Sequence, residues 1–226
     1  MEAPRWLASL AHLALVLSVP ILVIVTPLLV FITPGISRYE YSRPGFPPSE
    51  RFNPVERLRI SDAILRYLRG NETLESMSAV KTDAGEVALK PDEVQHLVDV
   101  KGVVDGFFRA YNIALLLAPL SAILLWNAGR RREICTCLRQ GVWIVAGLGL
   151  LVLVSSLIDF DMFFTRFHQV FFKPGTWVFY EEDTLIQLYP LPFWIDIVWK
   201  LAVAILAGSA IVYVGSIALE RASWMR

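Results

Sequence analysis

The sequence has few of the side chains on which common folds and catalytic sites are built. Only two of its 226 residues are cysteine and three are histidine, and 21 basic residues balance 21 acidic ones. Cys135 and Cys137 form a C-x-C pair. The two residues are too close in sequence for an unstrained disulfide, and two thiols are too few ligands for a zinc site. We therefore expect inert thiols. The zero formal net charge identifies no charged partner.

Several catalytic and cofactor motifs are also missing. The sequence contains no G-x-S-x-G nucleophile motif and no H-E-x-x-H zinc motif. A phosphate-binding loop and the glycine pattern of a dinucleotide-binding domain are absent as well. We therefore expect no nucleotide cofactor, no nucleic-acid partner and no acyl-enzyme formed on a serine.

Apolar residues, by contrast, are abundant: they make up 55% of the chain, against 19% for charged residues. Four runs approach the length of about 20 apolar residues that crosses a bilayer, at 10–32, 107–126, 142–158 and 193–219. The first run is too long for a signal-peptide core, and no small-x-small cleavage site follows it. We predict an all-α polytopic membrane protein with four transmembrane helices and a small outward-facing extramembrane domain.

Arginines set the predicted orientation of these helices. The short connection 127–141 carries four arginines against one acid, so the positive-inside rule places it in the cytoplasm. Both termini are then also cytoplasmic. Segments 33–106 and 159–192 are expected on the outer side of the membrane.

The first outer segment, 33–106, is expected to contain two helices after an irregular stretch from Pro34 to Pro54. A basic amphipathic helix over 54–69 would lie at the membrane interface or cover the ends of the spans. A second helix is predicted from Pro91 into the second span. Its His96 and Asp99 share a face at i, i+3, so the carboxylate either orients the imidazole or forms an exposed pair with it.

The second outer segment, 159–192, crowds phenylalanines around a single histidine. Phe164, Phe167 and Phe171 lie at i−4, i−1 and i+3 from His168. Apolar surroundings disfavour a charged imidazole, so His168 is a candidate neutral base. The alternative is a histidine that only hydrogen-bonds a helix end. The remaining histidine, His12, lies in the first span and is interpreted as a polar helix–helix contact.

Three motifs connect these histidines to a known family. They are H-L-V-D-V-K at 96–101, F-F-T-R-F-H-Q-V-F-F at 163–172, and W-V-F at 177–179 with D-T-L-I-Q-L-Y-P at 183–190. These motifs resemble those of the lipoprotein intramolecular transacylase family, integral membrane proteins of bacteria. The resemblance implies an acyltransferase that moves the sn-2 acyl chain of an S-diacylglyceryl-cysteine lipoprotein to its N-terminal amine, giving a lyso-form lipoprotein.

The same resemblance implies a location and a set of partners. The protein would lie in the bacterial cytoplasmic membrane with its site at the outer leaflet. Diacylated lipoproteins and membrane lipid would be its partners, and no cofactor, metal or obligate protein partner is expected.

The resemblance also implies roles for individual residues. His168 would act as general base and then as acid, and His96, oriented by Asp99, would polarise the ester carbonyl or share the proton transfer. Substrate binding or oxyanion stabilisation is expected from four further residues: Arg166, Lys101, Trp177 and Asp183. Of these, Asp183 is a candidate to hold the substrate ammonium.

Two other classes of function stay open at this point. One is a metal-dependent membrane hydrolase with His96, His168 and a carboxylate as ligands. The other is a non-enzymatic membrane scaffold or transport subunit, which the small number of ionisable residues in the spans disfavours.

Overall fold

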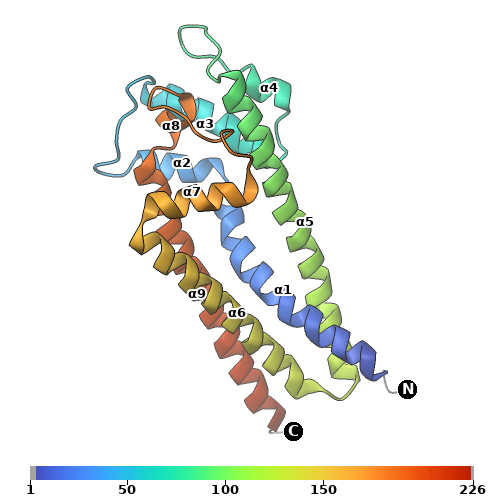
Figure 1. Cartoon of the computed structure of the whole chain (residues 1–226). Coiled ribbons are helices and arrows are strands. Elements are labelled where there is room, and N and C mark those ends of the chain that lie inside the picture. The colour runs from blue at the N-terminus through green and yellow to red at the C-terminus, as the bar shows by residue number, and fades with distance from the viewer. Residues whose placement is uncertain (1–3, 225–226) are drawn as a thin grey trace. The chain divides into compact units, whose positions relative to one another are not determined.

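A computed structural model describes residues 4–224, with side chains described as far as residue 221. The described residues form α-helices joined by turns, and their only β-type pairing is an isolated bridge between Lys81 and Val87 (Figure 1). The chain divides into two compact units. Unit 1 comprises residues up to 27, 107–160 and from 201 onward, and unit 2 comprises 28–106 and 161–200.

Four helices are long and apolar enough to cross a membrane, which confirms the predicted number of spans. They are α1 (Arg5–Phe31), α5 (Pro91–Asn127), α6 (Arg131–Ile158) and α9 (Leu191–Trp224). Helix α5 runs from its polar start at Pro91 without a break into the apolar stretch, as predicted.

The connection between α5 and α6 is much shorter than the predicted loop 127–141. It is a turn over 128–130, closed by Gly129 at φ 74°, and α6 begins at Arg131. Positive φ is a backbone conformation that glycine adopts without steric cost. The prediction started the helix at Val142, where the apolar run begins, but the arginines and glutamate before it are good helix formers and extend the same helix.

In unit 1, small and medium side chains let the helices approach closely. Gly141 of α6 lies against Val19 of α1, so that a Cβ atom at Gly141 would collide with the valine. Cys137 is fully buried among apolar residues of α1, α5 and α6, and Cys135 is also buried. Both thiols are shielded from reagents, as the expectation of inert thiols requires.

His12 lies at a contact between α1 and α6, as predicted. Its Nε2 is 2.9 Å from Oε1 of Gln140, and its Nδ1 is 3.4 Å from Oε2 of Glu133.

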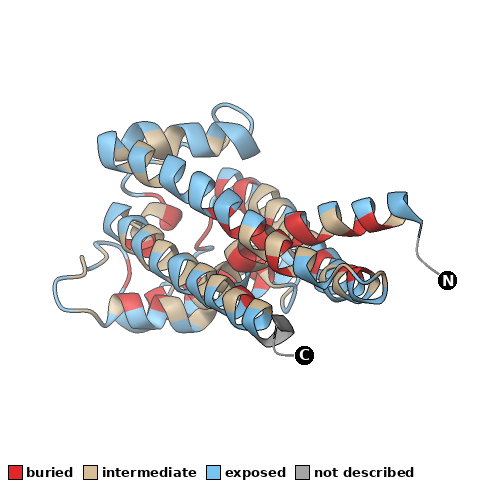
Figure 2. Cartoon of the chain, turned by 90° about the horizontal axis from the view of Figure 1, so that it is seen from below, coloured by how far each residue is buried: buried red, intermediate tan, exposed pale blue. Residues whose placement is uncertain are grey.

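Large apolar side chains on the long helices are exposed, among them Leu116 of α5 and Ile211 of α9. The pale blue outer sides of the helices in Figure 2 show this surface. Such a surface suits a lipid environment.

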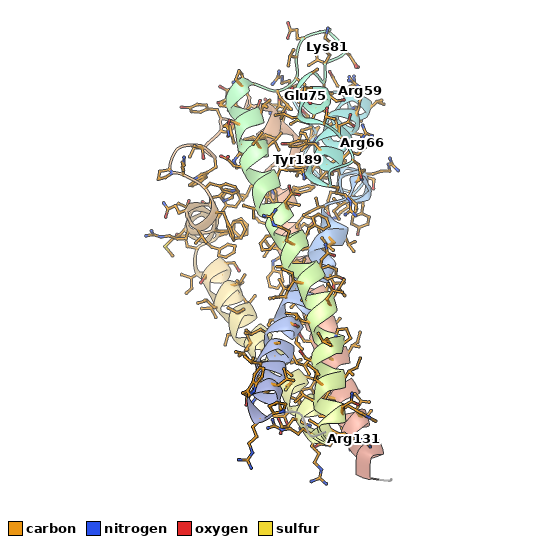
Figure 3. The ribbon with its side chains drawn as sticks, turned by 90° about the vertical axis from the view of Figure 1, so that its right-hand side faces the viewer. Arg59, Arg66, Glu75, Lys81, Arg131 and Tyr189 are labelled. Carbon is orange, nitrogen blue, oxygen red and sulfur yellow. The ribbon has the colours of Figure 1, made fainter. Side chains whose placement is uncertain are left out.

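Unit 2 contains five shorter helices together with the parts of α1, α5 and α9 that fall within 28–106 and 161–200. The shorter helices are α2 (Pro34–Tyr41), α3 (Pro54–Leu68), α4 (Leu74–Ser78), α7 (Phe160–Phe171, of which residue 160 belongs to unit 1) and α8 (Thr184–Leu188). Their apolar core includes Ile60, Ile64, Met77 and Leu188, all of which are fully buried. Within this core the hydroxyl oxygen of Tyr189, a residue labelled in Figure 3, lies 2.9 Å from the hydroxyl oxygen of Ser61 in α3. The Ser61 hydroxyl donates in turn to the hydroxyl oxygen of Ser37 in α2.

The predicted helix 54–69 is confirmed as α3, and its ends follow local rules. The Asn53 side chain accepts hydrogen bonds from the amides of Val55 and Glu56, Pro54 occupies the first position, and Gly70 follows at φ 77°. The irregular stretch predicted from Pro34 to Pro54 is wrong over its first part. Pro34 instead starts α2, where its missing N–H costs no hydrogen bond.

The basic side chains predicted for this helix, those of α3 and of Arg69 just after it, all have partners. Arg57 is buried and donates to the carbonyl oxygen of Pro47 at 2.9 Å. Arg69 donates to Leu29 O at 2.7 Å. Arg59 and Arg66, both labelled in Figure 3, bind acids: Arg59 pairs with Asp83 at 2.8 Å and Arg66 with Glu72 at 3.0 Å. The guanidinium groups thus bind within unit 2.

Candidate active site

Helix α7 places His168 on a face formed by aromatic side chains. Phe164 lies one turn before His168, and Phe172 one turn after it, just beyond the end of the helix. The chain then turns at 173–175, where Gly175 has φ 84°. This turn brings Trp177 back over the histidine, with ring centroids 4.8 Å apart.

One hydrogen bond defines the tautomer of His168. Its Nδ1 lies 2.8 Å from the carbonyl oxygen of Phe164. A carbonyl oxygen only accepts, so Nδ1 must carry the proton, and Nε2 of the neutral ring keeps its lone pair. Burial lowers the pKa of His168 below 6.5, although the bond to Phe164 opposes the shift. The ring is therefore a neutral base near neutral pH.

His96 faces His168 across the site. The two ring centroids are 6.4 Å apart and the ring planes are nearly parallel, at 24°. Phe172 and Phe179 pack against His96 through their edges, at 5.0 and 5.4 Å. The tertiary structure thus joins the two histidines that the sequence singled out, one from α5 and one from α7.

The side chain of His96 is held by rings and not by the predicted carboxylate. Its Nδ1 is buried and, within the described residues, has no hydrogen-bond partner. Asp99 accepts instead from Nε2 of Gln95, at 3.2 Å on the same helix. An orienting role for Asp99 stays a prediction.

Two of the expected oxyanion donors bind elsewhere. Arg166 is exposed and donates to Oε1 of Gln169 at 3.1 Å. Lys101 lies 2.6 Å from Oδ1 of Asp105, one turn further along α5. Among the described residues, no hydrogen bond joins either cation to His96 or His168.

Asp183 is buried, and both of its carboxylate oxygens have protein partners. Oδ1 pairs with the ammonium of Lys90, and Oδ2 accepts from the amide of Tyr180 at 2.7 Å. The residue immediately precedes α8, so these contacts hold the loop that carries Trp177 and Phe179. The observed contacts of Asp183 are those of a residue that positions this loop.

Glu93 is a supporting residue that the sequence analysis missed. Its fully buried carboxylate accepts from the amides of Lys90, at 2.8 Å, and Leu185, at 2.7 Å. It thereby joins the start of α5 to α8. An acid in the first turn of a helix was visible in the sequence, but that position alone explains only an interaction with the helix dipole.

Trp177, like His96, lies beside His168 and has a buried ring nitrogen. Its ring lies against His168, and its Nε1 is buried without a hydrogen-bond partner among the described residues.

No group of three or more histidine, cysteine or acidic side chains is placed to share a metal ion in the described part of the chain.

These features define a multi-pass α-helical membrane protein whose candidate site is a pair of histidines enclosed by aromatic rings. The family model of the lipoprotein intramolecular transacylase Lit matches residues 12–194, and the chain belongs to this family.

The chain is also similar to a protein of known sequence and to solved structures. An uncharacterised protein of Aquifex aeolicus is 28% identical over 162 residues, which is 70% of each chain. The fold is also similar to that of the Bacillus cereus transacylase Lit, with a TM-score of 0.79 at 19% identity over 99% of this chain and 100% of the other. A structure of that protein with a histidine-to-alanine substitution gives a TM-score of 0.73 at the same identity, covering 97% and 96% of the two chains.

Proposed function

We propose that this protein is an intramolecular acyltransferase of diacylated lipoproteins. It moves the sn-2 acyl chain from the glyceryl group on the N-terminal cysteine to the α-amine of the same cysteine. Family membership supports the reaction class. The observation that carries the proposal for this chain is the neutral, Nδ1-protonated His168 facing His96 inside an aromatic enclosure.

His168 supplies the proton transfers that the reaction needs. The substrate amine, with a pKa of about 8, must become neutral to attack the ester carbonyl. As the C–N bond forms, Nε2 of His168 takes a proton from the nitrogen. When the ester C–O bond breaks, the same Nε2 returns that proton to the leaving glyceryl oxygen. His96 shares this proton transfer or polarises the carbonyl.

The intramolecular nature of the reaction explains how a small site is sufficient. Amine and ester belong to one molecule, and well-oriented intramolecular groups react with effective concentrations of about 10⁵–10⁸ M. The protein must fold the substrate so that the two groups meet beside His168. Aromatic side chains such as Phe164 and Phe172, which line the histidine, suit a substrate with acyl chains.

Mass spectrometry of lipoprotein N-termini tests the proposal. A bacterial host without such an enzyme should gain lyso-form lipoprotein when it expresses the wild-type protein, and should not gain it with His168→Ala. His12→Ala is the matched control, because it removes a histidine whose ring nitrogens lie beside Glu133 and Gln140 of α6. Lyso-form product from the His168→Ala protein would disprove the base assignment.

We further propose that the site faces the outer leaflet and that both termini are cytoplasmic. The four arginines at 130–132 and 139 support this orientation. A fluorescent reporter fused to the C-terminus should fold and fluoresce, and a phosphatase fused there should be inactive. The reverse pattern would overturn the orientation.

A further inference from the structure

The proposed reaction develops a negative charge on the ester carbonyl oxygen, and a donor must stabilise it. The two cations expected for this role are bound to Gln169 and Asp105 on their own helices. Trp177, by contrast, has a buried indole N–H that finds no acceptor in the described part of the chain, on a ring 4.8 Å from the base. Buried polar groups in folded proteins nearly always have a partner, so an unpaired one beside the site needs an explanation.

The chain segments before and after Trp177 are both held by hydrogen bonds. The turn at 173–175 precedes it, with the amide of Thr176 bonded to the carbonyl oxygen of Lys173 at 3.3 Å. After it, Asp183 holds the loop through Lys90 and the amide of Tyr180. An oxyanion donor gains its effect from such preorganisation, because no rearrangement is needed while the charge develops.

A neutral donor also suits the chemistry of the neighbouring base. A guanidinium or ammonium group beside His168 would lower the pKa of its imidazole further and weaken it as a base. An indole N–H stabilises the oxyanion without adding a net charge to the site. Its strength increases in a site lined by apolar rings, where the local dielectric constant is low.

We propose that Trp177 is a catalytic residue whose Nε1–H donates a hydrogen bond to the ester carbonyl oxygen as this atom becomes an oxyanion. This inference rests on the proposed function. The amine nitrogen forms the C–N bond, and the carbonyl π electrons move to the oxygen that Trp177 binds. His168 removes the proton from nitrogen. The C=O bond then re-forms, the C–O bond to the glyceryl group breaks, and His168 protonates the departing oxygen.

Two substitutions separate the N–H from the ring that carries it. Trp177→Phe removes the donor and part of the ring, while genetic incorporation of benzothienylalanine at 177 replaces only the N–H by sulfur. We expect both variants to lose about 10²–10³-fold in kcat, the usual effect of deleting one oxyanion donor. KM should stay close to the wild-type value, and the acidic limb of the pH profile should not move. Trp194→Phe is the control, because the Trp194 ring packs on Phe164, Tyr189 and Phe193, and no ring contact with His168 is found among the described residues. This variant should turn over normally.

A benzothienylalanine variant that turns over at the wild-type rate would overturn the inference, even if Trp177→Phe is slow, because the ring alone would then be required. Thermal unfolding in detergent identifies loss of activity caused by misfolding. The benzothienyl side chain is chosen because it keeps the shape of the indole, so this variant should fold like the wild-type protein. Failure of the proposed function has a different signature: the wild-type protein itself would form no lyso-form product in the same assay.

Discussion

The Nδ1 atom of His168 lies 2.8 Å from the carbonyl oxygen of Phe164, one turn earlier on the same helix. This contact links backbone structure to proton chemistry, because it requires the N–H on Nδ1 and leaves Nε2 as the basic atom.

The first prediction concerns the pH dependence of the reaction. Burial puts the pKa of His168 below 6.5, so the neutral base is present above that pH and is lost as the pH falls through the lower, folded-state value. The observed rate should fall below about pH 8, because the substrate amine becomes protonated. After division by the neutral fraction of this amine, the rate at saturating substrate should not decline between about pH 7 and 6.5, the unperturbed histidine pKa, but should decline at more acidic pH. Initial rates of purified protein on a synthetic lipopeptide give this profile. A midpoint above 6.5 in the rate corrected for the amine would contradict the role of a buried His168.

The second prediction separates packing from chemistry at His96. His96→Phe keeps an aromatic ring between Phe172 and Phe179 but removes both nitrogens. We expect thermal stability in detergent close to that of the wild-type protein and a loss of about 10²–10⁴-fold in kcat, the usual contribution of one acid–base group. Unchanged turnover would remove His96 from the mechanism and leave His168 as the only histidine required.

The third prediction compares two partners of one contact. Asp183→Ala removes a buried carboxylate that accepts a hydrogen bond from the amide of Tyr180, and loss of a hydrogen bond to a charged group should cost about 1.5–3 kcal/mol of unfolding free energy. Lys90→Met removes only the half-exposed partner, and such a pair contributes about 0–1 kcal/mol. Chemical denaturation in mixed micelles measures both values. Equal losses in the two variants would show that the ion pair, and not the hydrogen bond to the loop, stabilises this region.

The fourth prediction concerns helix packing in unit 1. A methyl group at Gly141 collides with Val19, so Gly141→Ala should destabilise the protein by about 1–3 kcal/mol, the usual cost of overpacking. Gly147→Ala is the matched control, because its Cβ meets open space on the same helix. Val19→Ala in the Gly141→Ala background should recover stability in detergent melts. A loss that Val19→Ala does not relieve would place the strain elsewhere.

Much of the fold follows from local physical rules. A span must present about 20 apolar residues to lipid, so the runs that meet this requirement are visible without a structure. The start of α3 is likewise local, because Asn53 and Pro54 cap the helix from within the sequence itself. Helix α2 and the early start of α6 were missed, because polar helices carry no apolar run and depend on contacts made after folding.

The candidate site was only partly readable from the chain. The sequence by itself determined the inventory: two histidines in aromatic and charged motifs, four spans, and no serine or metal motif. Only the tertiary structure decided which groups meet. It placed His168 against His96 and Trp177, paired Asp183 with Lys90, and left Asp99 bonded to Gln95. Helical spacing specifies neighbours one turn apart, whereas contacts between distant segments depend on how the turns and buried carboxylates direct the chain.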